Sequence, residues 1–237
     1  MTEAVELTRE ANDYLIEAMQ LYPKRFAGFA TLPTAAPDIA AEELSTWLMN
    51  MVSKEEISTV THEAATWMIN FFGRFWSGQK RSRFHSTSIQ HCHRNPDGLS
   101  RAAWGWHIET AVHVLRLILS GAFDQFPDLQ IVIGHMGEAL PFMMPRIDKI
   151  LSPNIKKLNH PVADYLRENI YYTFSGFNFT QTFLNLYLQV GADRIMFSAD
   201  YPYSPMAQAR NFLDQLPVSP GDQHKIAHGN AECLLRL

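Results

Sequence analysis

Residues 131–138 read IVIGHMGE, a run of branched aliphatic residues followed by a glycine, a histidine and, three positions later, a glutamate. A short apolar run of this kind is typical of a strand buried on both faces in a parallel sheet. In a (β/α)8 barrel, polar residues at the C-terminal ends of the strands form the active site. His135 and Glu138 are therefore candidate catalytic residues. The structural alternative is that His135 bonds a neighbouring loop and Glu138 lies in the first turn of the next helix, where the helix dipole favours an acid.

The same alternation of helix and strand extends outward from this stretch. Upstream, HIETAVHVLRLILSG at 107–121 has the apolar spacing of a helix that stops at Gly121. Downstream, residues 165–176 give the end of a helix and a second strand, and residues 182–202 give a helix and a strand at 194–199. Alternating helices and apolar strands predict an α/β fold with a parallel sheet that is covered on both sides.

The N-terminal part adds one more unit of this pattern. Residues 4–20 predict an amphipathic helix, and RFAGFATLP at 25–33 has the composition of another buried parallel strand. At 237 residues, the chain has the length of a single TIM (β/α)8 barrel, which commonly spans roughly 200–250 residues. We therefore expect one barrel domain over residues 1–237.

A second polar strand end lies in MFSADYPY, residues 196–203, where Asp200 follows the predicted strand. Asp is a preferred helix N-cap and Pro202 would suit the start of a helix, so capping is the structural alternative. Strand ends that carry a histidine, a glutamate and an aspartate would together suit a hard divalent ion and an acid/base pair. Together, His135, Glu138 and Asp200 predict a metal-dependent active site.

Two residues near these motifs are candidates for substrate binding. Arg146, in MPRIDKI, has a planar guanidinium that matches a substrate carboxylate. An ion pair with Asp148 or with another subunit is the alternative for Arg146. Tyr203, which closes the motif around Asp200, is assigned to the same role.

The helix that begins WGWHIETAVHV also carries polar and aromatic side chains. His107, Glu109 and His113 lie on this helix, and Trp104 and Trp106 are large side chains of a type that usually packs. We expect all five to be structural.

Composition limits the classes of protein that the chain can represent. Apolar residues make up 46% and charged residues 19%, which is typical of a globular protein. The apolar runs are far shorter than the roughly 20 residues that span a bilayer, and the N-terminus lacks the pattern of an export signal. The net charge of −4, without a stripe of Lys and Arg, argues against nucleic acid. Cys92 and Cys233 lie far apart without CxxC spacing, so we expect a cytoplasmic protein.

Residues 44–98 break the alternation of helix and strand. The interval is rich in Ser, Thr, His, Trp and Met and has no run of branched aliphatics where at least two barrel strands should fall. Trp67 and Met68 have one codon each, so reading the same nucleotides two bases later forces an Asp, and Ile69 forces a second. Permitted codons allow residues 58–98 to be reread as a segment that contains YLDDQFLWP and then PFYLHP. We therefore interpret 44–98 as an out-of-frame translation.

The stretches at 104–148, 169–184, 190–203 and 226–237 resemble the amidohydrolase-related (amidohydrolase 2) proteins. They read WGWHIETAVHVLRLILSGAFDQFPDLQIVIGHMGEALPFMMPRID, NIYYTFSGFNFTQTFL, VGADRIMFSADYPY and IAHGNAECLLRL. Within that family they are most similar to the non-oxidative decarboxylases of dihydroxybenzoates such as γ-resorcylate, which are relatives of the aminocarboxymuconate-semialdehyde decarboxylases. The resemblance covers residues 99–237 and, less strongly, 1–43.

The resemblance implies a distorted TIM barrel that decarboxylates a small hydroxylated aromatic acid with the help of a divalent metal, zinc or manganese. In that family a Glu/His-x-His pair on the first strand, a histidine on a middle strand and an aspartate hold the metal; Asp200 matches the aspartate. His135 and Glu138 match the catalytic pair. The proton that replaces the carboxylate comes from Asp200 or His135. A homo-oligomer is also implied.

The family pattern is not complete in this sequence. The first-strand metal pair is expected well before residue 25, and the histidine of the YLHP segment is missing from the interval before residue 104. We therefore expect an incomplete barrel and an impaired decarboxylase that starts at an internal methionine. The alternatives are a metal-dependent hydrolase of the wider amidohydrolase superfamily and a non-catalytic remnant.

Overall fold

A computed structural model describes residues 2–23, 25–33, 36, 39–40, 42–43, 46, 98–99 and 101–235 of the chain. The chain divides into two compact units, Met1–His85 and Ser86–Leu237, which are described separately. Apart from Thr46 and Gly98, the interval interpreted as out of frame lies outside the described residues.

The first unit contains helix α1, Thr2–Leu21, which confirms the helix predicted at 4–20. The predicted strand at 25–33 is wrong, because this segment has no strand structure, and Phe26 and Phe29 are 50% and 71% exposed. Its backbone finds a side-chain partner instead. The Asn12 amide donates to the Thr31 carbonyl oxygen at 3.0 Å and accepts from the Thr31 N–H at 2.8 Å. These bonds use the backbone groups through which Thr31 would pair with a neighbouring strand.

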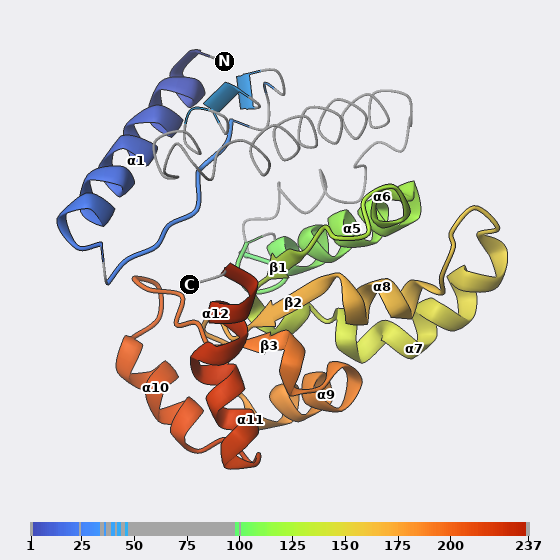
Figure 1. The fold of residues 1–237 in the computed structure, drawn as a ribbon. Helices are drawn as coiled ribbons and strands as arrows, with labels where there is room; N and C mark the ends of the chain where they lie inside the picture. Colours follow the sequence, from blue (N-terminus) through green and yellow to red (C-terminus); the bar gives the residue numbers. More distant parts are fainter. Residues whose placement is uncertain are drawn as a thin grey trace. The chain divides into compact units, whose positions relative to one another are not determined.

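The second unit is built on a parallel sheet of strands β1, Ile131–Ile133, β2, Ile170–Thr173, and β3, Ile195–Met196, in the order β1-β2-β3 (Figure 1). Ile131 pairs with Ile170, and Tyr172 pairs with Ile195. The three strands predicted in this part of the chain and their parallel direction are confirmed. Because parallel neighbours place their carboxyl ends at the same edge, the residues that follow the strands meet there.

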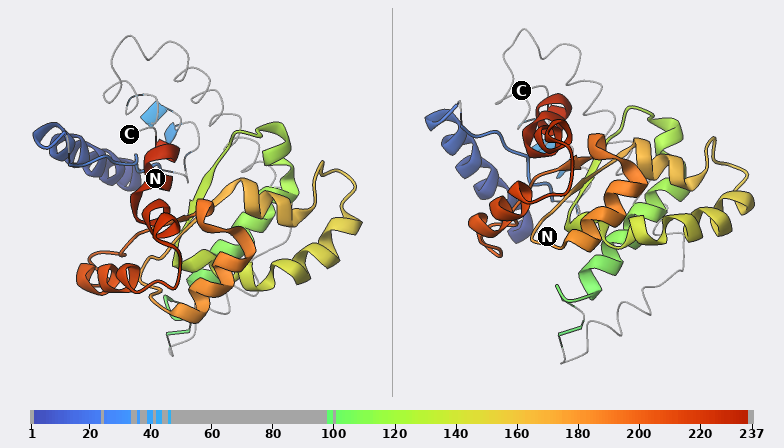
Figure 2. Two further views of the ribbon diagram at one scale, coloured as in Figure 1. Left: turned by 60° about the horizontal axis from the view of Figure 1, so that its bottom comes forward. Right: turned by 90° about the horizontal axis from the view of Figure 1, so that it is seen from below.

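Helices connect and surround the strands (Figures 1 and 2). They are α5, Gly105–Ser120; α6, Ala122–Gln125; α7, Leu140–Leu151; α8, Val162–Glu168; α9, Thr180–Val190; α10, Met206–Asp214; α11, Pro220–His224; and α12, Asn230–Leu235. Short 3-10 turns lie at η1, His135–Gly137; η2, Ser152–Asn154; and η3, Ala192–Arg194, and a π-helical turn η4 spans Lys225–Gly229. The predicted stop at Gly121 is confirmed, since this residue ends α5 in the left-handed conformation.

The core of the second unit lies around β2. Ile170, Tyr172 and Phe174 are fully buried, and Phe174 meets Phe183 and Phe212 edge to face. Each large apolar side chain buried in this way contributes about 1.5–3 kcal/mol. This packing holds β2 rigidly between its neighbours, so the loops that follow the strands start from fixed positions.

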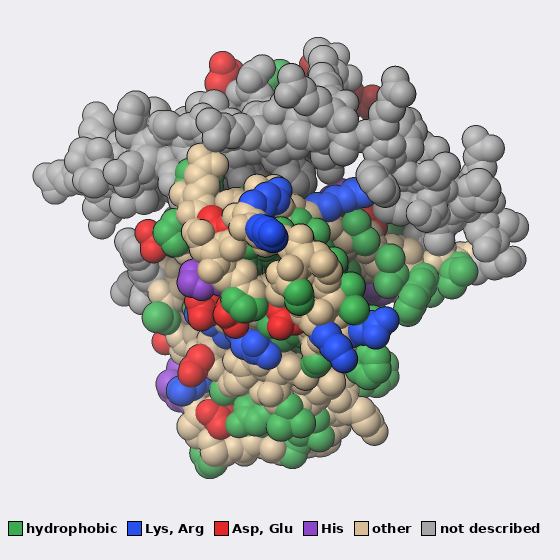
Figure 3. Space-filling model, turned by 90° about the vertical axis from the view of Figure 1, so that its right-hand side faces the viewer, with side chains coloured by type: hydrophobic (Ala, Val, Ile, Leu, Met, Phe, Trp, Pro, Cys, Tyr) green, Lys and Arg blue, Asp and Glu red, His purple; other side chains and the backbone are tan. Residues whose placement is uncertain are grey.

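Among the described residues, no helix is both long and apolar enough to cross a membrane. On the face of the protein shown in Figure 3, basic, acidic and apolar side chains are interspersed over the described part rather than gathered by sign. That face does not offer a broad cationic surface.

Candidate active site

The carboxyl ends of the three strands carry the strained backbone of the described part of the chain. The non-glycine residues with positive φ there are His135, Met136, Glu138, Ala139, Ser175 and Asp200. All of them follow β1, β2 or β3 within a few residues. A residue held in this region costs on the order of 1–3 kcal/mol, so it persists where the surrounding structure enforces it, as at functional sites.

The turn after β1 points Glu138 into the protein. Gly137 has φ +87°, and a Cβ on it would stand 2.7 Å from the Tyr172 ring, so a glycine is required where the turn meets β2. Helix α7 begins only at Leu140, with Ala139 as its N-cap residue. The alternative that Glu138 lies in the first helical turn is therefore wrong.

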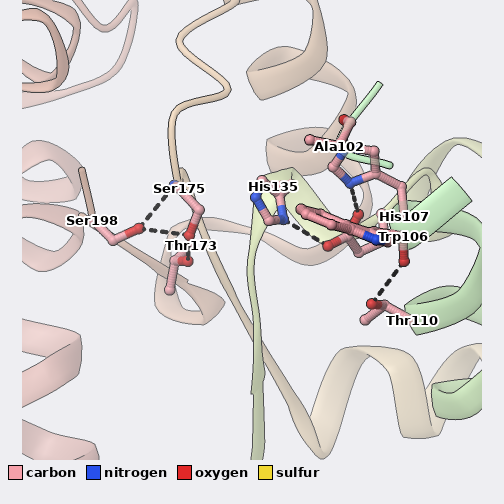
Figure 4. A network of polar contacts seen from close by, with 9 residues as sticks. Ala102, Trp106, His107, Thr110, His135, Thr173, Ser175 and Ser198 are labelled. Atoms are coloured by element: carbon pink, nitrogen blue, oxygen red, sulfur yellow. Dashed lines mark hydrogen bonds and ion pairs between the residues drawn. The ribbon is translucent and has the colours of Figure 1, made fainter. Parts of the chain in front are cut away.

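The Glu138 carboxylate is buried and shared by two imidazoles. Glu138 is 5% exposed, and its Oε1 lies 2.7 Å from Nδ1 of His135. Its other oxygen, Oε2, is hydrogen-bonded to Nδ1 of His107. The second imidazole nitrogen of His107, Nε2, meets the Ala102 carbonyl oxygen at 2.5 Å, and Figure 4 shows His107 and His135 close together.

The hydrogen bond that His135 donates to Glu138 raises the pKa of His135 above its ordinary value of 6.5. Partial burial opposes this shift, while the negative charges of Glu138 and Asp200 add to it. The shift increases the share of the imidazolium form of His135 at a given pH, and this form can deliver a proton.

His107 was expected to be structural, yet the structure brings it into contact with the predicted catalytic glutamate. It lies in the first turn of α5 and is 9% exposed. No spacing rule links it to Glu138, 31 positions away. The only signal in the sequence was a histidine on the buried face of a helix, which is more often a core residue.

Phe177, from the loop after β2, covers the imidazole pair. Its ring centroid lies 5.2 Å from that of His107 and 5.4 Å from that of His135, and the two imidazoles are 4.8 Å apart. An apolar ring at this position lowers the local dielectric constant, which strengthens the interactions of Glu138. Asn178, the next residue, has a buried side-chain amide with no hydrogen-bond partner in the described structure.

Hydroxyl groups tie the ends of β2 and β3 together (Figure 4). The Ser175 N–H donates to Ser198 Oγ at 2.8 Å, and the two hydroxyl oxygens lie 3.0 Å apart. Thr173 Oγ1 joins this hydrogen-bond network, 2.9 Å from Ser175 Oγ. The loops that carry Phe177 and Asp200 are thus fixed to one another.

Asp200 stands in the left-handed conformation at φ 66° in the loop after β3. The next helix, α10, begins at Met206 after Pro205, so the alternative of a helix cap at Asp200 is wrong. A Cβ on Gly176 would lie 3.6 Å from Asp200 Cβ, which places Asp200 against the loop of β2. Its charge also contributes to the raised pKa of His135, so the two predicted strand ends are electrostatically coupled.

The two residues assigned to substrate binding lie on the surface. Arg146 is exposed on α7, and its alternative partner Asp148 instead accepts hydrogen bonds from Ser152 Oγ and the Ala163 N–H. Tyr203 is 88% exposed. Neither makes a hydrogen bond or ion pair with Glu138 or its imidazoles within the described part, so the binding role of both stays a prediction.

The two tryptophans near His107 do not pack as expected. Trp104 and Trp106 are 53% and 54% exposed. Trp104 precedes α5 and Trp106 lies in its first turn.

The donor set at the strand ends suits a divalent metal. His107, His135 and Glu138 form a group whose candidate ligand atoms all lie within 4.8 Å of one another. Asp200 adds a carboxylate that is coupled to His135. Imidazole and carboxylate donors are ligands of both zinc and manganese. The chemistry of the residues therefore fits the divalent cation implied by the sequence resemblance.

The amidohydrolase family model matches residues 3–237. The γ-resorcylate decarboxylase of Polaromonas sp. strain JS666 is 36% identical over 260 residues, which cover 100% of this chain and 78% of the relative. A crystal structure of 2,6-dihydroxybenzoate decarboxylase in complex with 2,6-dihydroxybenzoate has a TM-score of 0.78 at 30% identity, covering 100% of this chain and 78% of that one.

A dihydroxybenzoic acid decarboxylase structure from the same Polaromonas strain contains manganese and the inhibitor 2-nitroresorcinol. Its TM-score is 0.78 at 30% identity, and the match covers 100% of this chain and 76% of that one. The chain therefore belongs to the amidohydrolase family, and a TIM-barrel-type α/β fold goes with that membership.

Proposed function

We propose that this chain is a metal-dependent, non-oxidative decarboxylase of a small hydroxylated aromatic acid. The observation that carries the proposal is the buried Glu138 carboxylate bonded to His135 at the end of β1, coupled to Asp200 at the end of β3. The relatives that act on γ-resorcylate and 2,6-dihydroxybenzoate support the same substrate class.

In this proposal Asp200 is a metal ligand. A divalent metal bound there would act as a Lewis acid and orient the oxygen atoms of the substrate. Asp200 is suited to this role because it is held in the loop after β3, fixed to the loop of β2. A rigidly held carboxylate loses little conformational entropy when it binds a cation.

His135 is the proposed proton donor. Glu138 accepts the hydrogen bond from Nδ1, which leaves Nε2 without a hydrogen-bond partner among the described residues. The raised pKa favours the protonated ring that this role requires. The ring carbon that bears the carboxylate takes this proton, the bond to the carboxylate breaks, and carbon dioxide leaves while the ring regains its aromaticity. Asp200 is the alternative donor.

Three polar residues are proposed to bind the substrate. Arg146 and Tyr203 are exposed and would take the carboxylate and a ring hydroxyl. Asn178 is a third candidate, because its buried amide has neither donor nor acceptor satisfied in the described part of the chain. A substrate hydroxyl would satisfy such an amide, since an unpaired buried polar group costs about 1–3 kcal/mol.

The test is carbon dioxide release from 2,6-dihydroxybenzoate by the purified chain loaded with manganese or zinc. Benzoate is the control substrate, because it has the carboxylate without the hydroxyl groups. Release from the dihydroxy acid alone supports the proposal. Hydrolysis of amide or ester substrates without carbon dioxide release favours the alternative of a metal-dependent hydrolase, and metal-free inactive protein favours a non-catalytic remnant.

We further propose that residues 44–98 are an out-of-frame translation inside a single barrel domain and that the barrel and its activity are impaired as a result. Restoring the shifted reading would return a YLHP histidine to the metal site. A catalytic zinc site typically has three protein ligands, so this histidine matters for affinity. Sequencing the DNA across codons 44–100 tests the idea, and codons that do not permit the shifted reading would refute it.

The restored chain, with the shifted reading over 44–98, provides the functional comparison. It should release carbon dioxide faster than the chain as given. Equal rates would show that the interval does not limit the activity.

A cytoplasmic homo-oligomer is also proposed. The location rests on the two cysteines, which lie far apart in the sequence without CxxC spacing, and Cys233 is an exposed free thiol. Self-association is supported by large apolar side chains exposed on neighbouring helices α7 and α9, such as Phe142 at 72% and Leu188 at 81%. Light scattering coupled to gel filtration tests it, and a mass of one chain would contradict it.

A further inference from the structure

Glu138 has two imidazole partners, and only His135 belongs to the motif that predicted the site. The side chain of Glu138 is 4% exposed, and its only ion-pair partners within the described residues are the two histidines. A buried carboxylate without compensation costs several kcal/mol. His107 therefore supplies half of the interactions that keep Glu138 in place.

His107 is itself anchored at both ring nitrogens. Nδ1 faces Glu138 Oε2, and Nε2 faces the Ala102 carbonyl oxygen. Both partners present oxygen acceptors to the ring. The ring cannot turn without losing one of these bonds, so its position fixes the position of the carboxylate.

The distances within this group are those of hydrogen bonds. His135 Nδ1 lies 2.7 Å from Glu138 Oε1, and His107 Nδ1 is hydrogen-bonded to Oε2. A zinc ion with ligands at about 2.0–2.2 Å keeps neighbouring donor atoms roughly 3 Å or more apart. The three side chains would have to spread to take a metal between them.

Burial separates the roles of the two histidines. The His107 side chain is 11% exposed, whereas that of His135 is 31% exposed. A ring enclosed to this degree, with both nitrogens in use, does not touch a substrate. A ring that is one-third open, with Nε2 free of described partners, can do so.

We infer that His107 is a positioning residue for the proposed decarboxylation: it holds the Glu138 carboxylate so that Glu138 fixes the tautomer and orientation of His135. This inference rests on the proposed function. The chain of contacts runs from the Ala102 carbonyl through His107 and Glu138 to His135. Carboxylate partners of this kind set the tautomer of a functional histidine.

Two matched variants separate the two bonds of His107. In His107→Asn the side-chain amide nitrogen is attached where Nδ1 was, so it can still donate to Glu138. In His107→Gln the amide nitrogen lies farther out, near the place of Nε2, so it can still donate to Ala102 but not to Glu138. His113→Asn is the control, because His113 lies on the same helix, is exposed, and faces Glu109 instead.

The measurement is long-range 1H–15N NMR of the histidine rings in the full chain, which reports which nitrogen of His135 is protonated. We expect the pattern of His135 in His107→Asn and His113→Asn to match that of the unsubstituted chain. In His107→Gln the two nitrogens of His135 should move toward a mixture of tautomers. Where decarboxylation is measurable, kcat should fall roughly 10- to 100-fold in His107→Gln, with KM within about 2-fold.

The result is decisive in either direction. The inference would be overturned if His107→Asn and His107→Gln both fold and give the same protonation pattern of His135. It would also be overturned if His107→Gln preserves that pattern better than His107→Asn does. Zinc that shifts the Nδ1 signals of His107 and His135 together would overturn it as well, because the group would then be a metal site. If His107→Gln does not fold, a strongly deshielded proton on His107 Nδ1 in the unsubstituted chain supports the bond to Glu138, and its absence refutes it.

The proposed function can fail separately from this inference. If the chain releases no carbon dioxide but His135 follows the predicted order of variants, the decarboxylation is wrong and the positioning of His135 by His107 stands. If carbon dioxide is released but the protonation pattern of His135 is the same in all variants, the decarboxylation stands and the positioning role of His107 is wrong.

Discussion

The two ends of the same three strands bury polar side chains in different ways. At the amino ends, the Asn169 amide donates to the carbonyl oxygens of Pro127 and Leu129 at 2.9 and 3.0 Å. Asn230 does the same for Ala192 and Ile195, at 2.8 Å each. At these ends, neutral side chains satisfy fixed backbone groups.

At the carboxyl ends the partners are ionisable side chains. Glu138 bonds His107 and His135, and Asp200 lies close enough to affect the pKa of His135. The backbone there is strained, whereas no residue of β1, β2 or β3 itself has positive φ. Burial of polar groups alone thus does not mark a functional site. The nature of the partner does, because a carboxylate and an imidazole can exchange a proton and an amide and a carbonyl cannot.

The sharpest test of this contrast is His135→Asn, at the carboxyl ends, because asparagine keeps an amide nitrogen where Nδ1 donates to Glu138 and removes Nε2. We expect kcat to fall by roughly 10²–10⁴-fold, the usual contribution of a general acid. The melting temperature should change little, since His135 is partly exposed. Steady-state kinetics measures kcat, and thermal unfolding measures the melting temperature. Both are done in the form of the chain, given or restored, that decarboxylates faster. Retained kcat would remove His135 from the chemistry.

Asn169→Ala should give the opposite pattern, at the amino ends. Two backbone carbonyls lose their donor, and we expect the free energy of unfolding to fall by about 1–3 kcal/mol. In a chain of this size each kcal/mol lowers the melting temperature by roughly 2–4 °C. Activity per folded molecule should stay near that of the unsubstituted chain. A large loss of kcat at full stability would break the distinction between the two ends.

The smallest effect concerns the pH dependence of stability. The pKa of His135 is raised in the folded protein, so its contribution to stability is fully present below its unfolded value of about 6.5 and is lost as the pH rises through the folded value. In Glu138→Gln the main cause of the shift is gone. The loss of stability as the pH rises from below 6.5 through the folded pKa of His135 should therefore be smaller than in the unsubstituted chain.

Thermal unfolding across this pH range, with an NMR titration of His135 in both proteins, measures the pH effect. A His135 pKa that does not fall in Glu138→Gln would contradict the assignment of its cause.

Much of this arrangement could be predicted from the sequence because it depends on local order. The apolar runs at β1, β2 and β3 and the polar residues directly after them fix where His135, Glu138 and Asp200 stand. His107 could not be found in this way. Its contact with Glu138 depends on how α5 packs beside the strands, which a pattern of single residues does not encode.

The strand at 25–33 was mispredicted for a related reason. Its apolar composition fits a strand, but pairing depends on what stands beside the segment. At Thr31 the neighbour is the amide of Asn12. The alternatives of Glu138 in a first helical turn and of Asp200 as a helix cap were wrong because left-handed turns separate both residues from the following helices.

The contact between Gly137 and the Tyr172 ring has a consequence for how the sequence can drift. A side chain at position 137 could be accepted only after position 172 had become small, and the Tyr172 hydroxyl, bonded to the Leu166 carbonyl at 2.6 Å, discourages that change. Gly137 and Tyr172 therefore each limit the substitutions that the other position can accept. In related sequences the two positions should change together or not at all.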